Sequence, residues 1–324
     1  MAELSIIIPV YNVSRYIRMC FDSILSQDTR DTEILVIDDG STDESGRICD
    51  EYEQANPCMR VIHKRNEGVS IARNTGIANA SGTWISFVDP DDFVSDHYME
   101  FFRSVCGTST DIAFFSFCML SPDGVITENR MDEGEYMGRK LVQEGMFHLM
   151  RGYGPLGYTV NKFFRREIIQ EHQIRFVDRQ TYREDTLFTL DYCRFVHSLT
   201  TSGQILYTYR IIPGSLSHRE TDVHEVFRYA DILLQHLHAY DDSTFLSMEY
   251  DQLLHVLINV YTPVLPREDK MSLHQRISTI IKDYKPYLRH LKKTRLFSFL
   301  YSLPSWMSHP AMELILIRIY HQNG

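Results

Sequence analysis

Short apolar segments rich in β-branched residues alternate with helical patterns through roughly the first quarter of the chain, and this alternation constrains the fold more than any other feature. Continuous runs such as Ile6-Ile7-Ile8 suit strands that are buried on both faces. Strands are expected at 4–10, 33–37, 59–63 and 84–88, and helices at 14–27, 44–55 and 69–79. The pattern predicts an α/β fold with a doubly wound, mostly parallel, Rossmann-like sheet, in which ligands bind beyond the carboxyl ends of the strands.

The pattern changes after the first hundred residues. We expect a hairpin, a helix, a glycine-rich loop and one more strand, at 111–118 with 125–129, at 136–151, at 152–157 and at 205–211. From residue 223 onward the pattern is helical, with helices expected at 223–239, 244–261, 268–283, 287–303 and 311–321. The sequence therefore predicts an α/β domain over residues 1–218, with halves at about 1–105 and 106–218, followed by a helical module over residues 219–324.

Charge and hydropathy exclude several classes of protein. The 324 residues carry a formal net charge of −10, which argues against nucleic acid as the main partner. No apolar run approaches the roughly 18–20 residues that span a bilayer, and the apolar stretch at 4–10 has no basic leader. The six cysteines form no CxxC pair, which favours reduced thiols over disulfides or a zinc site. Together these features predict a cytoplasmic protein.

Basic residues gather near the C-terminus. Residues 282–324 carry a net charge of +5, whereas the first 281 residues carry −15. Between 282 and 303, aromatic residues and leucines interleave with the basic ones, which suits an interfacial helix at the inner face of an anionic membrane. A helix packed on the rest of the protein, or a dimer contact with a solvated basic edge, explains the same pattern, so both interpretations stay open.

Asp89-Pro90-Asp91-Asp92 follows the last of the four predicted strands. Three carboxylates within four residues repel one another unless a cation lies among them. Mg²⁺ and Mn²⁺ bind carboxylate oxygens together with the oxygens of a diphosphate. The alternative is that Asp91 or Asp92 caps a helix expected near residue 96. Polar segments at the other strand ends favour the metal site.

Polar residues also follow the other three predicted strands. Asp39 is placed to accept the imide N–H of uracil, although Asp-Gly before Ser or Thr is also ordinary turn chemistry. Gly68 allows a close approach of the backbone to a ligand, and Arg73, otherwise a solvated helix residue, is suited to contact a diphosphate. The sequence contains no GxGxxG after the first strand and no GxxxxGK[ST], which counts against dinucleotide-binding and P-loop proteins. The three segments are Pro9-Val10-Tyr11-Asn12, Asp38-Asp39-Gly40-Ser41-Thr42-Asp43 and Asn66-Glu67-Gly68 with Ala72-Arg73-Asn74-x-Gly76.

Together, the four segments resemble the family 2 glycosyltransferases, whose catalytic domain has the GT-A fold. The resemblance covers roughly residues 3–218, and the helical tail resembles no family that we can name. It implies a setting in bacterial surface-polysaccharide assembly, such as capsule synthesis. Beyond the four segments it rests on Asn161-Lys162, on Arg183-Glu184-Asp185 with Phe188, and on Tyr209-Arg210 with Pro213-Gly214-Ser215.

The resemblance implies a role for each matching residue. Asp185 would be the general base, with Glu184 beside it helping to place the acceptor, although two acidic residues at a helix start are also favoured by the helix dipole. Asp91 would ligate the Mn²⁺ or Mg²⁺ that bridges the diphosphate, and His218 is a second candidate ligand or a structural histidine. Asp39 would hold the base and Asp89 the ribose or sugar. The donor-binding set is Pro9, Tyr11, Asn12, Asp39, Gly68, Arg73 and Asp89.

The implied reaction is an inverting single displacement from a nucleotide-sugar, in the first place a UDP-sugar. Asp185 takes the proton of an acceptor hydroxyl as that oxygen attacks the anomeric carbon, and the metal stabilises charge on the leaving diphosphate. The expected acceptor is a glycan or a lipid-linked saccharide. Two other classes stay open. A sugar nucleotidyltransferase would need a basic phosphate-binding loop after the first strand, and a non-catalytic nucleotide-sugar-binding protein would not need a base.

Overall fold

The computed structural model describes residues 2–139, 142, 145, 146, 157–213, 222–240, 243–260 and 265–284. The chain divides into two compact units, Met1–Arg219 and Glu220–Gly324. The described part of the second unit contains three helices, which confirm the helices expected at 223–239, 244–261 and 268–283. They are α8 (Val223–Leu237), α9 (Ser243–Asn259) and α10 (Arg267–Tyr284). The helices expected at 287–303 and 311–321 lie outside the described residues.

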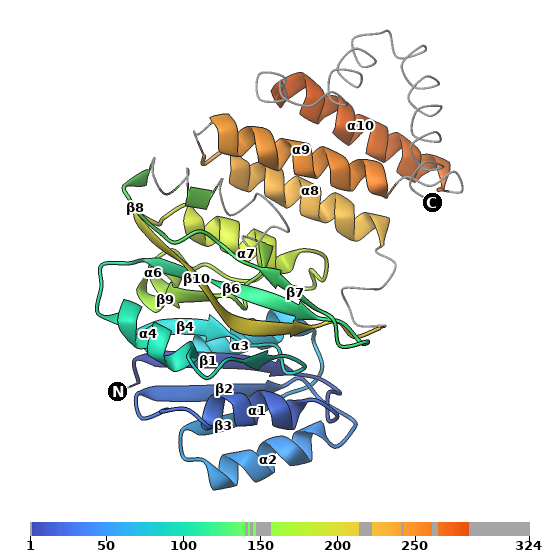
Figure 1. The fold of residues 1–324 in the computed structure, drawn as a ribbon. Helices are drawn as coiled ribbons and strands as arrows, with labels where there is room; N and C mark the ends of the chain where they lie inside the picture. The colour runs from blue at the N-terminus through green and yellow to red at the C-terminus, as the bar shows by residue number, and fades with distance from the viewer. Residues whose placement is uncertain are drawn as a thin grey trace. The chain divides into compact units, whose positions relative to one another are not determined.

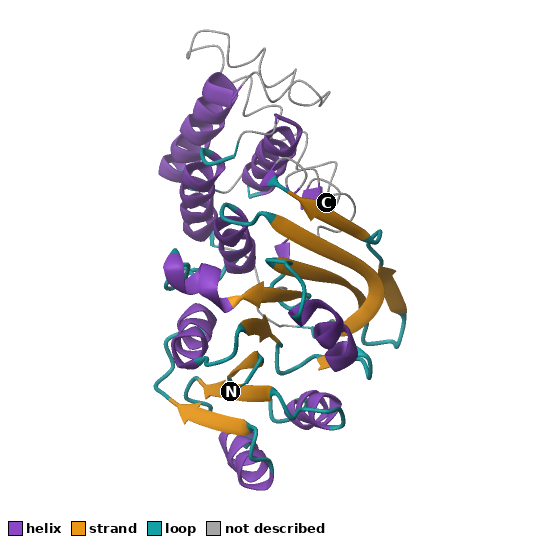
Figure 2. Cartoon of the chain, turned by 90° about the vertical axis from the view of Figure 1, so that its left-hand side faces the viewer, coloured by secondary structure: helices purple, strands orange, loops and turns teal. Residues whose placement is uncertain are grey.

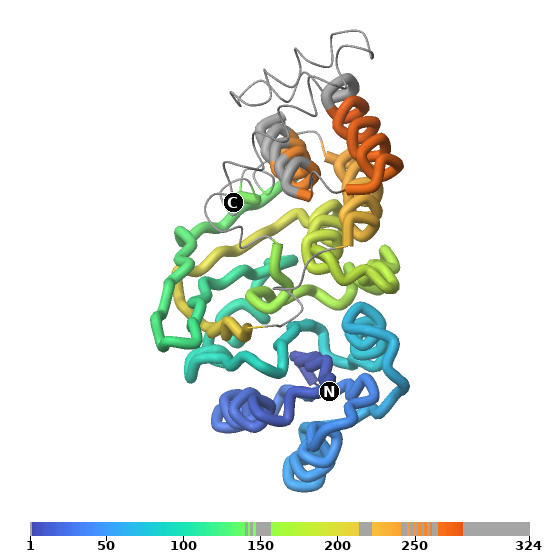
Figure 3. Tube along the Cα trace, turned by 90° about the vertical axis from the view of Figure 1, so that its right-hand side faces the viewer, coloured from blue at the N-terminus to red at the C-terminus, as the bar shows by residue number. Residues whose placement is uncertain are grey.

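A ten-stranded sheet forms the centre of the first unit (Figure 1). Its main path has the order β3-β2-β1-β4-β9-β6-β10-β5, while β7 pairs with β6 and β8 pairs with β10. The trace in Figure 3 shows the first strands, in blue, at one side of this sheet and the later strands, in green and yellow, at the other. The strands are β1 (Leu4–Val10), β2 (Thr32–Asp38), β3 (Met59–His63), β4 (Trp84–Phe87), β5 (Phe93–Val94), β6 (Ile112–Leu120), β7 (Ile126–Asn129), β8 (Gly134–Met137), β9 (Lys162–Arg165) and β10 (Ser198–Arg210).

The first four strands pair as the sequence predicts. β1 lies between β2 and β4 and is parallel to both, and β2 is parallel to β3. Their carboxyl ends therefore meet at one edge of the sheet. β9 runs antiparallel between β4 and β6, and β5, β7 and β8 also pair antiparallel. The α/β fold is confirmed, and the sheet is mixed: β1–β4 are parallel at the predicted nucleotide side, and β6 and β10 form another parallel pair in the other half.

Two predicted segments differ from the structure. The helix expected at 136–151 begins later, because Gly134–Met137 forms β8, which pairs with β10 and alternates in burial as an edge strand does. Gly138 follows with φ +86°, a backbone conformation that ends the strand. The described residues 139, 142, 145 and 146 are helical, as expected. The strand expected at 205–211 is the second half of β10, which spans 13 residues with two register shifts.

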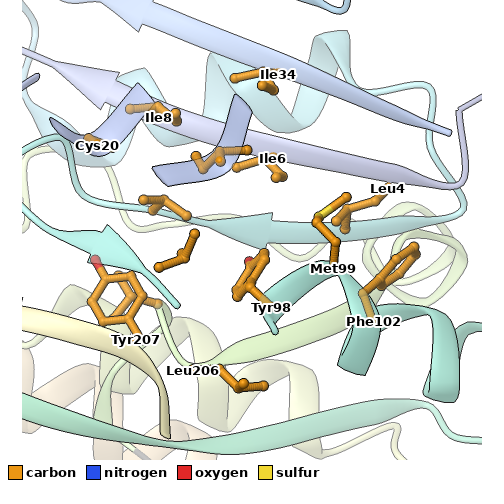
Figure 4. Close-up of a cluster of buried hydrophobic side chains, with 14 of the residues drawn as sticks. Leu4, Ile6, Ile8, Cys20, Ile34, Tyr98, Met99, Phe102, Leu206 and Tyr207 are labelled. Atoms are coloured by element: carbon orange, nitrogen blue, oxygen red, sulfur yellow. The ribbon is translucent and has the colours of Figure 1, made fainter. Parts of the chain in front are cut away.

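Helices cover both faces of the sheet (Figure 2). On one face, Leu4, Ile6 and Ile8 of β1 pack in a cluster with residues of α1, α2 and α4 (Figure 4). On the other face, Phe87 of β4 packs edge-on against Phe188 of α7. The helices of this unit are α1 (Ile17–Leu25), α2 (Ser45–Ala55), α3 (Val69–Asn79), α4 (Tyr98–Cys106), α6 (Arg166–Glu171) and α7 (Glu184–Cys193).

Two glycines place α3 against the sheet. A Cβ on Gly76 would lie 2.3 Å from Cγ2 of Ile7, so only glycine lets this helix approach β1 so closely. Gly68, with φ +95°, is the residue from which α3 begins. The start of α3 is thereby held beside the carboxyl ends of the strands, and Arg73 follows one turn later.

Candidate functional site

Arg73 of α3 joins carboxylates from two distant parts of the chain. Its Nη2 donates to Asp89 Oδ1 at 2.9 Å, and its Nη1 donates to Glu184 Oε1 at 3.0 Å and to Asp185 Oδ1 at 2.8 Å. The Arg73 side chain is 4% exposed, and its guanidinium lies over the ring of Phe176 at 5.2 Å. We call Arg73, Asp89, Glu184 and Asp185 the acid cluster. The structure thus brings together the predicted base and the predicted sugar contact, while Arg73 contacts carboxylates rather than standing free for a diphosphate.

Charge in the acid cluster is only partly balanced, because one guanidinium faces three carboxyl groups. Burial, and then the charge of Asp185, raises the pKa of Glu184 to about 8. Burial also raises the pKa of Asp89, against the opposing charge of Arg73. Burial alone would lower the pKa of Arg73, but the charges of Asp185, Asp89 and Glu184 outweigh it and raise the pKa. The cluster as a whole therefore binds a proton more readily than free carboxyl groups do.

Asp92 holds the strand-end loop onto β10 and does not cap a helix. Its carboxylate accepts hydrogen bonds from Tyr207 Oη at 2.6 Å and from the Arg210 backbone N–H at 2.7 Å. The Tyr207 hydroxyl also accepts from the Asp89 backbone N–H at 3.1 Å. α4 begins only at Tyr98, after His97, so the alternative interpretation, in which Asp91 or Asp92 caps a helix near residue 96, is wrong. The loop is fixed from β10 instead.

Asp91 differs from its two acidic neighbours in being left available. No hydrogen bond joins its carboxylate to another described residue, whereas its backbone carbonyl accepts from Arg210 Nε at 3.0 Å. Burial, and then the charge of Asp89, raises the pKa of Asp91 to about 6. A cation beside this carboxylate would reverse that shift.

Asp39 connects two of the strand-end segments. Its Oδ2 accepts the Gly68 N–H at 2.8 Å, and its Oδ1 accepts from Lys64 Nζ at 2.7 Å and from the Glu67 N–H at 3.1 Å. Asp39 is buried, so this carboxylate fixes the loop between β3 and α3. Lys64 was not singled out from the sequence, and its position directly after a strand was the available signal.

Pro9, Tyr11 and Asn12 lie at the end of β1, as expected. Pro9 is buried within the strand, and Tyr11 is 48% exposed just beyond it. Asn12, at φ +52°, accepts the Thr42 N–H at 2.8 Å through Oδ1. Its own N–H donates to Ser41 Oγ at 3.1 Å. The segment after β1 thus holds the segment after β2, and Tyr11 remains open to a ligand.

Two buried residues, Thr159 and Lys162, lie next to Asp185 in the hydrogen-bond network. The Thr159 backbone N–H donates to Asp185 Oδ2 at 3.3 Å. Lys162, wholly buried at the start of β9, donates from Nζ to the carbonyl of Tyr158 and to Asn161 Oδ1, the latter at 2.7 Å. The sequence identifies Asn161-Lys162 as a motif but does not predict the contact of Lys162 with Tyr158, which precedes β9.

Several predictions cannot be followed in the structure. His218, the other candidate metal ligand, and most of the basic tail at 282–303 lie outside the described residues. Among the described residues, no three His, Cys, Asp or Glu side chains are grouped so that they could hold a metal ion. None of the described helices is both long enough and apolar enough to cross a membrane. All six cysteines are described and all are free thiols, as expected.

Comparison with known proteins assigns the class that this fold and site indicate. A family model described as "Glycosyl transferase family 2" matches residues 5–172, which is just over half of the chain. The chain therefore belongs to glycosyl transferase family 2. It is 33% identical over 216 residues to the uncharacterized glycosyltransferase EpsJ of Bacillus subtilis (strain 168), covering 66% of this chain and 62% of EpsJ. It is 31% identical over 222 residues to the glycosyltransferase GlyA of Streptococcus pneumoniae serotype 4, covering 66% of this chain and 31% of GlyA. The chain thus spans less than two thirds of these relatives.

Solved structures share the fold. S. aureus TarS residues 1–349, in complex with UDP-GlcNAc, superposes with a TM-score of 0.66 at 19% identity, covering 87% of this chain and 81% of that one. The mannosyltransferase PcManGT of Pyrobaculum calidifontis, in complex with GDP-Man and Mn²⁺, gives a TM-score of 0.50 at 13% identity, covering 96% and 87%. These likenesses confirm the expected GT-A arrangement.

Proposed function

We propose that this protein transfers a sugar from a nucleotide-sugar to an acceptor hydroxyl with inversion, and that Asp185 is the general base. The observation that carries the proposal is the acid cluster, in which Arg73 holds Asp185 and Asp89 to one guanidinium. Asp89 follows β4 at the predicted donor side, whereas Asp185 begins α7 in the predicted acceptor half. A base is thereby fixed close to the donor-side carboxylate, as a single displacement requires.

Asp185 is suited to take a proton because its two oxygens are already oriented. Oδ1 accepts from Arg73 and Oδ2 from the Thr159 N–H, so the carboxylate has one defined position. Its side chain is 17% exposed and so still reaches solvent and an acceptor. Burial raises the pKa of Glu184 to about 8, so this carboxyl group is suited to donate a hydrogen bond to the acceptor when it carries a proton.

We propose Asp91 as the residue that holds a divalent cation. Mg²⁺ and Mn²⁺ commonly take one or two protein carboxylates and complete their coordination with substrate phosphates and water, so the lack of a larger ligand group among the described residues fits such a site. Asp91 is the carboxylate of this loop that no other described residue hydrogen-bonds, while Arg210 Nε donates to its backbone carbonyl and Tyr207 holds the neighbouring Asp92. When bound with the donor, the cation would supply positive charge beside the leaving diphosphate. His218 remains a proposed second ligand.

We propose a UDP-sugar as the donor, with Tyr11 and Asp39 near its uracil base and Asp89 near the ribose or sugar. The TarS complex with UDP-GlcNAc supports this choice through its fold, and Tyr11 offers an exposed ring for stacking. The proposed acceptor is a glycan or lipid-linked saccharide in surface-polysaccharide synthesis, on the inner side of the cell membrane. That setting rests on the family alone.

Donor hydrolysis tests the function without knowledge of the acceptor. Purified protein with Mn²⁺ is incubated with UDP-N-acetylglucosamine, UDP-glucose, UDP-galactose and GDP-mannose, and the nucleotide products are separated. Release of nucleoside diphosphate from one donor is the expected result. Release of monophosphate or pyrophosphate would show a nucleotidyltransferase instead, and donor binding without any product would indicate a binding protein.

Replacing the proposed base separates catalysis from binding. Asp185→Asn keeps an oxygen for Arg73 but removes the proton acceptor, so we expect donor turnover to fall about 10²- to 10⁴-fold. Donor affinity, measured by calorimetry with Mn²⁺, should stay within a few-fold. The matched control is Asp191→Asn on the same helix, where the carboxylate pairs with Arg194. Normal turnover by Asp185→Asn would remove Asp185 from the base role.

A further inference from the structure

Lys162 is a buried lysine that the proposed reaction does not use directly. It is wholly buried, and burial lowers its pKa to about 7. Its Nζ also lies over the ring of Phe114, 4.6 Å from the ring centre. Burying an amine costs free energy that an apolar side chain of the same length would not incur. An amine buried at this cost is therefore expected to make a specific contact.

The amine of Lys162 contacts the same peptide group that supports the proposed base. Lys162 Nζ donates to the carbonyl oxygen of Tyr158. The nitrogen of that peptide belongs to Thr159, and its N–H donates to Asp185 Oδ2 at 3.3 Å. One peptide group thus accepts from Lys162 on its oxygen and donates to Asp185 on its nitrogen. Hydrogen bonds in such a chain polarise one another, and the effect is larger where water is excluded.

Neighbouring contacts hold the Lys162 side chain in place. Asn161 Oδ1 accepts from Lys162 Nζ at 2.7 Å, and Asn161 Nδ2 donates to the Phe115 carbonyl of β6 at 3.2 Å. The backbone carbonyl of Lys162 accepts from Ser86 Oγ of β4 at 2.8 Å. Thr159 and Asn161 are wholly buried. The amine is therefore oriented by the centre of the sheet rather than by a mobile surface group.

We propose that Lys162 is a positioning residue for Asp185, acting through the Tyr158–Thr159 peptide group, which it orients and polarises so that the Thr159 N–H holds the Asp185 carboxylate in place. The proposal rests on the proposed function for its catalytic consequence, but the contact itself can be observed without turnover. Both the charged and the neutral amine donate a hydrogen bond, so the role does not require one protonation state. Lys162 does not touch the reacting atoms.

The contact can be followed at the Thr159 amide by NMR. Protein labelled with ¹⁵N-threonine gives one resonance per threonine, and the Thr159 resonance is the one that Thr159→Ser removes. Lys162→Met keeps the length of the side chain and removes the donor. We expect it to move the Thr159 amide proton upfield, in the same direction as Asp185→Asn, because either change weakens the same chain of hydrogen bonds.

The matched control is Phe114→Leu, which removes the ring beside Nζ and leaves both peptide contacts. It should move the Thr159 resonance less than Lys162→Met does. In donor hydrolysis with Mn²⁺, Lys162→Met should lower kcat about tenfold and leave KM within twofold, since the base is displaced and donor binding is not. Lys162→Gln, which keeps a neutral donor, should restore part of the resonance shift and part of kcat.

An unchanged Thr159 resonance in folded Lys162→Met would overturn the proposal, as would equal shifts in Lys162→Met and Phe114→Leu. If Lys162→Met does not fold, Lys162→Gln carries the test, because its shorter side chain restores the donor only in part. A Thr159 shift no larger than that of Phe114→Leu, with no fall in kcat relative to Phe114→Leu, would then overturn the proposal. If the wild-type protein hydrolyses none of the donors, the proposed function fails, whereas the Thr159 resonance still reports on the Lys162 contact.

Discussion

Arg73 is the residue on which the site depends most, because it is the cation that Asp89, Glu184 and Asp185 share. A guanidinium suits this task better than an amine, since its planar fork donates in several directions at once. Its Nε is buried and has no hydrogen-bond partner among the residues that the structure describes. Because the guanidinium of Arg73 contacts three carboxyl groups, it stays charged although it is buried.

Removing Arg73 should destabilise the protein in a pH-dependent way. In Arg73→Met the three carboxylates lose their cation, and we expect a loss of about 3 kcal/mol at pH 7. The loss should shrink at pH 5, where the carboxylates are more readily protonated. Urea unfolding at the two pH values measures both effects. Arg18→Met, which removes an exposed pair with Glu51, is the control and should change stability little. Equal losses at both pH values would contradict the charge argument.

Glu184 makes its own prediction about pH. Its pKa rises from 4.5 to about 8 on folding, so the folded state binds the proton more tightly than the unfolded state. The stabilisation is complete below pH 4.5 and is lost as the pH rises toward 8. Glu184→Gln cannot ionise and should lose less stability than wild type between pH 5 and pH 8. Thermal unfolding across this range measures the difference, and parallel curves for the two proteins would show that Glu184 does not titrate there.

Among the secondary-structure elements, β10 contributes as much to the site as β1–β4, whose carboxyl ends lie there. Tyr207 reaches from β10 to Asp92 and to the Asp89 N–H, and so fixes the loop that carries Asp91. The sequence predicted this strand only in part, because its register with β6 shifts twice in the middle of the strand, between Ser202 and Tyr207. A strand of 13 residues with two register shifts lacks the strict alternation by which strands are recognised.

Tyr207→Phe tests whether this strand supports the proposed metal residue. Loss of the hydroxyl removes one of the two donors to the Asp92 carboxylate and the acceptor of the Asp89 N–H, so we expect about 1–3 kcal/mol less stability. The Mn²⁺ concentration needed for half-maximal donor hydrolysis should also rise several-fold. Tyr98→Phe removes another buried hydroxyl, one bonded to Ser86, and should cost stability without changing the Mn²⁺ requirement. An equal rise in the Mn²⁺ requirement of both variants would show that the effect is not specific to Tyr207.

The accuracy of the sequence predictions differs between the two halves of the first unit. The elements expected at 4–10, 59–63 and 69–79 match the structure residue for residue. For β1 the reason is continuous burial, because all seven of its residues are buried. β9 and β5, with four and two residues, are too short to show any period. The strand-end rule located Asp39, Asp89 and Asp91, but the pairing of Arg73 with residues more than a hundred positions away depends on the insertion of β9 beside β4. Local sequence does not contain that information.

For the whole molecule, the described residues show where the sheet unit ends and three helices follow, and the family is established on the first unit. The basic tail adds a hypothesis that belongs to the full chain. If residues 282–303 bind an anionic membrane surface, the protein should float with vesicles that contain phosphatidylglycerol, and a truncation before Lys282 should not. Binding should weaken as salt is raised. Vesicles of neutral lipid are the control, and equal flotation of both proteins would favour a packed helix or a dimer contact.

The sharing of Arg73 between Asp89 and the Glu184-Asp185 pair has a thermodynamic consequence. Any ligand that changes the charge near Asp89 changes how strongly Arg73 holds Asp185, and the reverse is equally true. On the proposed function, donor and acceptor affinities are therefore linked, and each ligand alters the affinity of the other by the same factor. A single side chain thus makes the two halves of the site respond to one another before any bond is formed.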